Sequence, residues 1–129
     1  MEAPAWSLLC RTSPPAYDIS NGQQLWVARY QGQDTQSNFN SITRAIGLNA
    51  DGSHVFVTGA SPGIGTSLDY VTIGYGTSAG TQLWVARYDG PAHLSDTPMG
   101  LAVHGTNVYV TGSRQVGLTT DYATVAYSE

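Results

Sequence analysis

The chain contains an internal repeat, which constrains its fold more than any other feature. The heptapeptide Gln-Leu-Trp-Val-Ala-Arg-Tyr occupies residues 24–30 and recurs unchanged at residues 82–88, an offset of 58 residues. Two further segments recur with small changes: residues 55–59 (VFVTG) return as residues 108–112 (VYVTG), and residues 69–75 (DYVTIGY) return as residues 121–127 (DYATVAY). Such self-similarity is typical of folds in which one supersecondary unit is stacked repeatedly.

The composition favours strands over helices. Val, Ile, Thr and the aromatic residues together make up 42 of the 129 residues, and these are the residues that fit a pleated, half-buried surface. The chain has five Arg, no Lys and only two Glu, so it lacks the residues from which exposed helices are normally built. We therefore expect an all-β fold.

Each repeat is predicted to form four short strands. In the best-defined copy these are residues 44–48, 54–59, 69–75 and 82–88, with tight turns at residues 51–52 (Asp-Gly) and 77–80. The other copy supplies strands near residues 99–104, 107–112 and 121–127, and an earlier fourth strand at residues 24–30. In the fourth strand Trp84 and Tyr88 share one face and Leu83 and Val85 the other, so we expect both faces of the sheet to be covered.

A four-stranded antiparallel unit that repeats every 50–60 residues and is covered on both faces is typical of a β-propeller blade. The segments quoted above resemble the bacterial β-propeller repeats of the SBBP type, in which DYxTVxYDxxTGxxLWxxRY and xDGxxVYVTGxS recur. The Gly-x-x-Leu-Trp element at residues 22–26 and 80–84 is also similar to the quinoprotein-type (PQQ-like) repeats. The resemblance covers residues 17–129. It implies propeller blades and a secreted or cell-envelope location.

The repeat predicts the domain organisation. Residues 1–16 form a non-repeat N-terminal segment, and residues 17–129 hold the fourth strand of one blade, a complete blade at residues 44–90 and strands one to three of the next. This is about two blades, an incomplete ring. We expect residues 24–30 to pair with residues 121–127, in the same chain or a neighbouring copy, because both would otherwise be unpaired edges. The predicted partners are further blades or other copies of the chain.

Charge and cysteine content exclude several classes of function. The net charge is −4 and the sequence pI about 5.1, which removes the electrostatic basis for binding nucleic acid. No apolar run approaches the roughly 20 residues of a membrane span, and we expect no signal peptide on this chain. Cys10 is the only cysteine, which excludes an internal disulfide and a cysteine-based zinc cluster.

One motif suggests a cofactor. Residues 58–65 match the T-G-x-x-x-G-x-G turn of short-chain dehydrogenases, which holds a pyrophosphate at a helix N-terminus. However, residues 69–75 alternate like a strand, the second copy of the repeat loses the glycines, and a chain without lysine cannot supply that family's Tyr-x-x-x-Lys pair. We therefore expect a glycine-rich strand connection, with no nicotinamide or other cofactor.

Residues that recur with the repeat are interpreted as structural. Trp26 and Trp84 are predicted to pack on neighbouring blades. The arginines that follow them three residues later, Arg29 and Arg87, are predicted to extend to the rim of the sheet. Asp69 and Asp121, which open the third strand in each copy, are interpreted as turn caps or loop hydrogen-bond acceptors in preference to metal ligands. No catalytic or metal site is predicted.

The non-repeating loops are the candidate binding surface. Residues 31–43 and 89–98 are polar and rich in amides and carboxylates, which suit sugar hydroxyls or a calcium ion, although such loops also occur simply as solvated connections. The candidate ligand-binding residues are Asp34, Asn38, Asn40, His93 and Asp96.

These observations favour a non-catalytic propeller segment that serves as a rigid structural module or binds a protein or glycan ligand. Two alternatives remain open: a fragment of a PQQ-like quinoprotein enzyme, and a lectin-like binder built from several two-blade chains. A single bound quinone or calcium ion would favour the first, and several equivalent glycan sites would favour the second.

Overall fold

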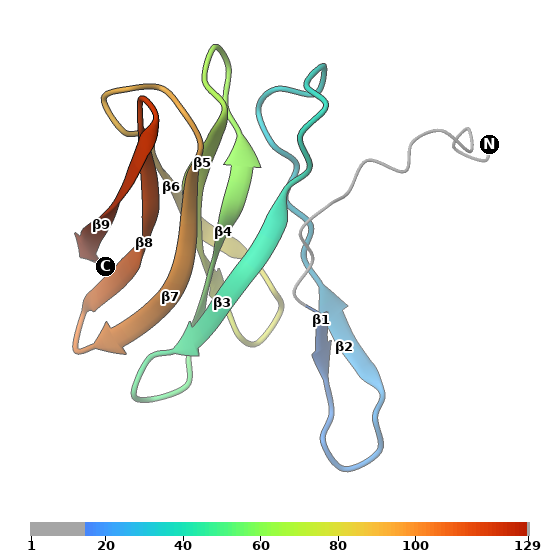
Figure 1. The fold of residues 1–129 in the computed structure, drawn as a ribbon. Coiled ribbons are helices and arrows are strands. Elements are labelled where there is room, and N and C mark those ends of the chain that lie inside the picture. The colour runs from blue at the N-terminus through green and yellow to red at the C-terminus, as the bar shows by residue number, and fades with distance from the viewer. Residues whose placement is uncertain (1–14, 129) are drawn as a thin grey trace, which may run out of the picture.

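The computed structural model describes residues 15–128, which form nine strands in three antiparallel sheets (Figure 1). No helix occurs within this range, so the predicted all-β class is confirmed. In the described part of the chain there is accordingly no helix of the length and apolarity that a membrane crossing requires.

The middle sheet is the complete repeat unit. Its strands are β3 (Ile42–Leu48), β4 (His54–Pro62), β5 (Leu68–Gly76) and β6 (Gln82–Tyr88), paired in sequence order. The predicted four-stranded sheet over residues 44–88 is therefore confirmed. Because β5 is a strand, the glycine-rich turn before it does not lead into the helix that a dinucleotide site of the dehydrogenase type requires.

The third sheet repeats the geometry of the middle one. It contains β7 (Asp96–His104), β8 (Asn107–Val116) and β9 (Thr119–Ser128). In both the middle and the third sheet the first strand has a register shift, and the two shifts fall at the same repeat position. The shift lies between Thr43 and Ala45 in β3 and between Pro98 and Gly100 in β7. The sequence repeat is thus a repeat of backbone structure, including its irregularity.

The first sheet is a small hairpin of β1 (Pro15–Tyr17) and β2 (Gln24–Val27). Its register matches that of β5 and β6, because Tyr17 lies opposite Gln24 just as Tyr75 lies opposite Gln82. β1 therefore stands where a third strand belongs and extends across the predicted boundary between residues 16 and 17. The prediction that residues 24–30 pair within the chain with residues 121–127 is wrong, because β1 occupies that edge of β2.

The same heptapeptide adopts two different strand lengths. Residues 82–88 are a seven-residue strand, whereas the strand formed by residues 24–30 ends at Val27. β6 lies beside the nine-residue β5, but β2 has only the three residues of β1 to pair with. A strand extends as far as its hydrogen-bonding partner, so the difference follows from pairing and not from local sequence.

The core consists of two apolar clusters, one on each face of the middle sheet. On one face Val55, Val57, Val71, Ile73 and Tyr75 pack against Trp26, Ala28 and Tyr30 of the N-terminal segment. On the other face Phe56, Tyr70 and Trp84 pack against the third sheet through Val108, Val110 and Tyr127. β4 and β5 are consequently buried along almost their whole length.

The expectation that both faces of the sheet are covered fails at its outer strand. Leu83 and Val85 of β6 are 47% and 45% exposed. The reason is the width of the first sheet, since its two short strands cover the centre of the middle sheet and not its margin.

Each of the two register shifts depends on a glycine in the facing strand. A Cβ atom added to Gly59 would collide with the carbonyl oxygen of Ile42, and one added to Gly112 would collide with that of Thr97 and lie 2.6 Å from Cα of Pro98. The backbones approach so closely here that no side chain fits. This explains why the Val-x-Val-Thr-Gly motif ends in glycine in both copies.

We predict that Gly112→Ala lowers the free energy of unfolding by about 1–3 kcal/mol, because the backbone of β7 must move to admit the methyl group. Urea denaturation measures the change. Gly100→Ala is the matched control, since its Cβ would have no neighbour closer than 3.8 Å, and it should leave stability nearly unchanged. Equal effects of the two substitutions would contradict this account of the motif.

Candidate functional site

The non-repeating loops gather at one end of the sheets. Residues 31–41, the β4–β5 hairpin, residues 89–95 and the β8–β9 hairpin all lie at the upper end in Figure 1. We call this surface the loop end. The five predicted ligand-binding residues divide there: Asn38, Asn40 and His93 are exposed, Asp34 is half-buried and Asp96 is fully buried.

The loop of residues 31–41 is held by its own hydrogen bonds. The backbone N–H of Gln36 donates to Oδ1 of Asp34 at 2.9 Å, and the Ser37 hydroxyl donates to the carbonyl oxygen of Asp34 at 3.2 Å. The loop encloses a cavity of about 20 Å³, lined in part by Asp34 and Asn40, which has room for little more than one water molecule. Asp34 therefore shapes the loop, and the amides of Asn38 and Asn40 are among its solvent-facing groups.

His93 is bound to its own turn. Its Nδ1 lies 2.5 Å from Oδ2 of Asp89, and the backbone at His93 is left-handed, with a φ of 53°. The N–H of His93 also donates to the carbonyl oxygen of Gly90 at 3.0 Å. The imidazole is exposed, so its remaining nitrogen is available to solvent or a ligand while the side chain is positioned by Asp89.

Asp96 supports the loop from beneath. It is 0% exposed, and its Oδ2 accepts a 2.6 Å hydrogen bond from the N–H of Gly90 at the start of the same loop. Burial raises the pKa of its carboxyl above the usual 3.8, although the bond from Gly90 opposes that shift. The structure thus places Asp96 inside the protein as a loop anchor, not on the surface where a ligand could reach it.

An ion pair that the sequence analysis did not predict joins the loop end to the core. Nη1 of Arg87 donates to Oδ2 of Asp69 and to the carbonyl oxygen of Ser61, each at 2.9 Å, and Nη2 donates to the Tyr30 hydroxyl at 3.2 Å. The Asp69 side chain is only 1% exposed and that of Arg87 17%. Burial raises the pKa of Asp69, and Arg87 and Thr66 oppose this by donating hydrogen bonds to it.

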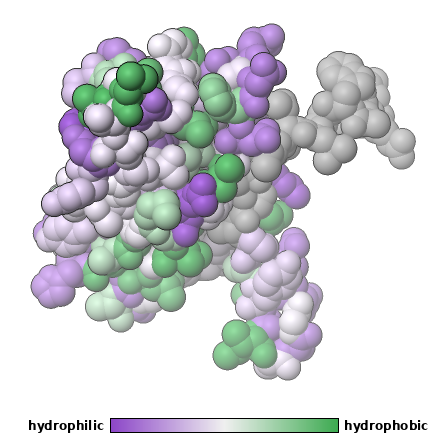
Figure 2. Space-filling view, in the orientation of Figure 1, coloured by the Kyte–Doolittle hydropathy of each residue, from purple (hydrophilic) through white to green (hydrophobic). Residues whose placement is uncertain are grey.

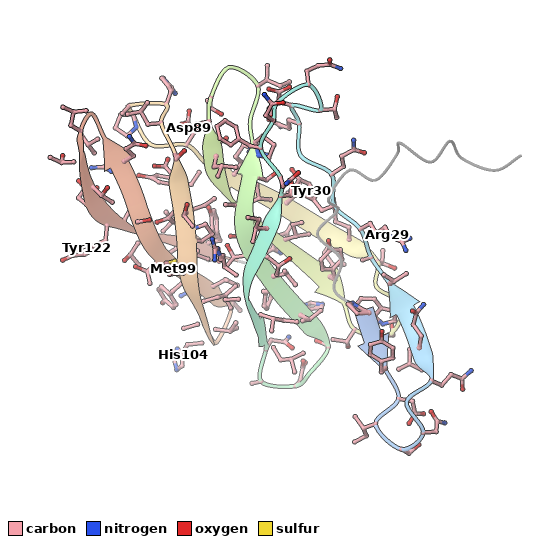
Figure 3. All side chains as sticks on the ribbon, turned by 45° about the vertical axis from the view of Figure 1, so that its right-hand side comes forward. Arg29, Tyr30, Asp89, Met99, His104 and Tyr122 are labelled. Atoms are coloured by element: carbon pink, nitrogen blue, oxygen red, sulfur yellow. The ribbon has the colours of Figure 1, made fainter. Side chains whose placement is uncertain are left out.

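This ion pair corrects the predicted role of Arg87 and adds a partner to Asp69. Arg87 does not extend to the rim but turns inward, because the carboxylate of Asp69 lies below it. Asp69 does accept a hydrogen bond from the loop residue Thr66, at 3.0 Å, and this part of the prediction is confirmed. The identical heptapeptide gives another outcome at Arg29, which is exposed and points away from the sheets in Figure 3.

The second copy of this aspartate has a different partner. Asp121 receives two hydrogen bonds from Arg114 of the adjacent strand, at 2.9 Å from Nε and 2.7 Å from Nη2. The bonds from Arg114 lower the pKa of Asp121. Arg114 stands at the repeat position of Ser61, so the arginine comes from the second strand here and from the fourth in the middle sheet. The only sequence signal for these two ion pairs was that an aspartate, Asp69 or Asp121, opens the third strand in both copies of the repeat.

Tyr70 links the two larger sheets beneath the loops. Its ring is fully buried, and its hydroxyl lies 3.3 Å from the carbonyl oxygens of both Ser113 and Ala123, to which it can donate. Burial raises the pKa of Tyr70 to about 12, so the hydroxyl remains protonated at physiological pH. The loop end therefore rests on a base that is fixed by buried polar contacts.

The loop end offers hydrogen-bonding groups on an anchored frame. Among the described residues, no three or more His, Cys, Asp or Glu side chains are placed so that they could hold a metal ion. The exposed amides of residues 31–41 and the His93 ring are suited to hydrogen bonds with sugar hydroxyls or peptide groups. Comparison with known proteins adds no relative, since no family model, curated protein or solved structure matches the chain.

We predict that Arg87→Ala lowers the free energy of unfolding by about 3–5 kcal/mol, because it leaves the buried carboxylate of Asp69 without its counterion. Arg29→Ala removes the exposed copy of the same residue and should cost less than about 0.5 kcal/mol. Thermal or urea denaturation distinguishes the two. The double variant Asp69→Asn/Arg87→Ala should be more stable than Arg87→Ala alone, and a less stable double variant would contradict the ion-pair interpretation.

The buried Asp96 predicts a pH dependence of stability. Its pKa is raised in the folded protein, so the folded state binds more protons than the unfolded chain above about pH 4, and the free energy of unfolding falls as pH rises through the folded pKa. Asp96→Asn should weaken this decline, because asparagine does not titrate, while its amide oxygen still accepts the bond from Gly90. Asp121→Asn should lower stability above about pH 4 and change the slope only below it, since the pKa of Asp121 is lowered and the stabilisation by its ionised carboxylate is lost as pH falls. An unchanged slope in Asp96→Asn would disprove the assignment.

Proposed function

We propose that the chain is a segment of a β-propeller that acts as a rigid, non-catalytic module and presents the loop end to a protein or glycan ligand. The observation that carries the proposal is the stacking of successive repeat units face to face in one repeated geometry. Trp26 of the first sheet lies 6.5 Å from Tyr75 of the second, and Trp84 of the second lies 6.0 Å from Tyr127 of the third, measured between ring centroids. The two contacts involve the same repeat positions.

The middle and third sheets approach each other most closely along their first strands, as blades around an axis do. β7 contacts β3, β4 and β5, and β3 and β7 run side by side in Figure 1. Farther from β3 and β7 the space between the sheets is filled by large rings, with Phe56, Trp84 and Tyr127 in contact. Small spacing at the first strands and bulky side chains at the outer ones support a wedge-shaped arrangement of blades.

The chemistry of the loop end supports binding over catalysis. Its buried charges are engaged in positioning: Arg87 binds Asp69, and Asp96 binds the backbone of Gly90. The polar groups that residues 31–41 leave facing solvent are chiefly neutral amides and hydroxyls, which suit ligand hydrogen bonds. A net charge of −4 disfavours nucleic acid as the ligand. The resemblance to envelope-associated repeats extends the proposal to an extracytoplasmic location.

Electron microscopy or crystallography of the assembled protein tests the architecture. We expect sheets radiating from an axis, with β3 and β7 nearest to that axis and β6 at the periphery. Sheets stacked along a line without a common axis would overturn the propeller proposal.

A titration with pyrroloquinoline quinone and Ca²⁺ tests the non-catalytic role. We expect no saturable binding and no dye-linked oxidation of alcohols or sugars. Saturable quinone binding would overturn the non-catalytic proposal in favour of a quinoprotein fragment.

A glycan or peptide array tests the ligand role. Binding that is lost in the variant Asn38→Ala/Asn40→Ala would support it, with Gln82→Ala at the opposite end of β6 as the control.

A further inference from the structure

The outer face of the third sheet exposes positions that the middle sheet buries. In the middle sheet Phe56, Thr58, Tyr70 and Thr72 are 0–1% exposed because the third sheet covers them. Their repeat counterparts on the third sheet are Tyr109, Thr111, Tyr122 and Thr124, and all four are exposed, Tyr122 to 84%. Figure 3 shows Tyr122 pointing away from the sheet. A hollow of about 390 Å³ on this face is lined by Tyr109, Thr111, Thr124 and the facing part of β7.

The opposite face of the middle sheet is also incompletely covered. Ile46 and Leu48 of β3 are 62% and 58% exposed, whereas their repeat counterparts Leu101 and Val103 pack against the apolar cluster between the two larger sheets. In Figure 2 apolar residues gather on the surface over the lower ends of β3 and β7. An open space of about 170 Å³ separates Ile46 and Leu48 from Trp26.

These two exposed faces are the two halves of an interface that the chain already contains once. Between the middle and third sheets, a face of the Phe56 and Tyr70 type packs against a face of the Leu101 and Val103 type. The face of the third sheet offers the first type again, and the face at β3 offers the second. A contact between different faces of identical molecules is heterologous, so it joins copies head to tail.

The short strand β1 stands where β9 of another copy would fit. β1 ends in Ala16-Tyr17, and β9 carries Ala126-Tyr127 at the corresponding repeat positions. β1 pairs with β2 at only three positions, and one of these is Pro15, which has no N–H to donate. Among the described residues β9 pairs on one side only, with β8. Exchanging β1 for β9 would replace a three-residue ladder with a full-length one.

We propose that the chain binds a second copy of itself head to tail, with the outer face of β7, β8 and β9 of one copy covering Ile46 and Leu48 of the next. Residues 24–30 of the second copy then pair with β9 in the register of β5 and β6, with Gln24 opposite Tyr127 and Trp26 opposite Ala126. This inference rests on the proposed propeller and names its partner. Three such copies would contribute six blades, within the range of roughly four to eight that closed rings use.

The exchange preserves the existing contacts of residues 24–30. Trp26, Ala28 and Tyr30 contact the middle sheet through their side chains, and the new pairing uses the backbone edge that β1 now occupies. It also brings the exposed Arg29 to the position that Arg87 holds beside its aspartate, so that Arg29 meets Asp121. Charge and apolar complementarity therefore favour the same register.

Two charge substitutions test the docking in solution. Tyr122→Glu blocks one face and Ile46→Glu the other, and both side chains are exposed in the single chain, so folding should be retained. We expect wild-type chains to associate in sedimentation velocity, and each variant alone to lose association by roughly tenfold or more in Kd. Mixing the two variants should restore a one-to-one dimer, because one intact interface remains. Leu118→Glu, an exposed position on the β8–β9 hairpin, is the control and should associate like wild type.

A disulfide trap tests the strand register. In a Cys10→Ser background, Ala28→Cys on one copy and Thr124→Cys on another stand at the positions that Ala86 and Thr72 occupy as direct neighbours. Mixed under mild oxidation, they should form a covalent heterodimer. Thr111→Cys, on the same face but one strand farther away, is the matched control and should not cross-link with Ala28→Cys.

Three outcomes would overturn the proposal: a wild-type chain that stays monomeric at high micromolar concentration, mixed charge variants that do not dimerise, or Thr124→Cys copies that cross-link only with each other through paired β9 edges. None of these outcomes would by itself refute the propeller proposal, because the sheets could still radiate from a common axis in an assembly with blades other than a second copy of this chain. Conversely, head-to-tail dimers without a common axis would retain the docking and refute the ring.

Discussion

The fold depends on the packing of a fourth-strand tryptophan against a tyrosine of the following sheet. The contact occurs twice, between Trp26 and Tyr75 and between Trp84 and Tyr127. In the first instance the indole N–H also donates to the carbonyl oxygen of Thr77 at 2.8 Å, which fixes the ring relative to the next sheet. Large rings at these positions set the spacing of the sheets, and this spacing encloses the valines and isoleucines of β4 and β5 on both sides. A single sheet of this sequence would expose one apolar face to water.

The stacking that buries the core also organises the loop end. Arg87 and Asp69 meet across adjacent strands of the middle sheet, and Tyr30 joins them because the N-terminal segment packs on that sheet. A buried ion pair of this kind contributes little net stability, since desolvation offsets the attraction, but it restricts how the segments can be arranged. The loops above it are consequently held at defined positions. That rigidity is what a binding surface requires if its exposed amides are to recognise a ligand without a large entropic cost.

Every sheet in the stack has two unlike faces, and this asymmetry has consequences at the ends of the stack. Inside, a face rich in tyrosine and threonine meets a face rich in leucine and valine. One face of each kind is left exposed, on the outer side of the third sheet and over β3 of the middle sheet, together with an edge of β9 that pairs with no other described strand. Exposed apolar faces and open strand edges favour association, and the repeat makes the two ends complementary to each other. The same feature that lets units stack within the chain therefore favours stacking between chains.

The sequence by itself determined every described strand except β1, together with their order and turns, because alternation, β-branched residues and Asp-Gly or Gly turns are local signals that the exact heptapeptide repeat places in register. It also located the loops that carry Asn38, Asn40 and His93. Only the tertiary structure decided the rest. The heptapeptide is seven residues of strand at Gln82–Tyr88 but four at Gln24–Val27, and its arginine is buried in one copy and exposed in the other. Asp96 likewise lies inside the loop it was expected to expose. Strand length, burial and ion pairing depend on what lies opposite a residue in space, and identical segments differ wherever their neighbours differ.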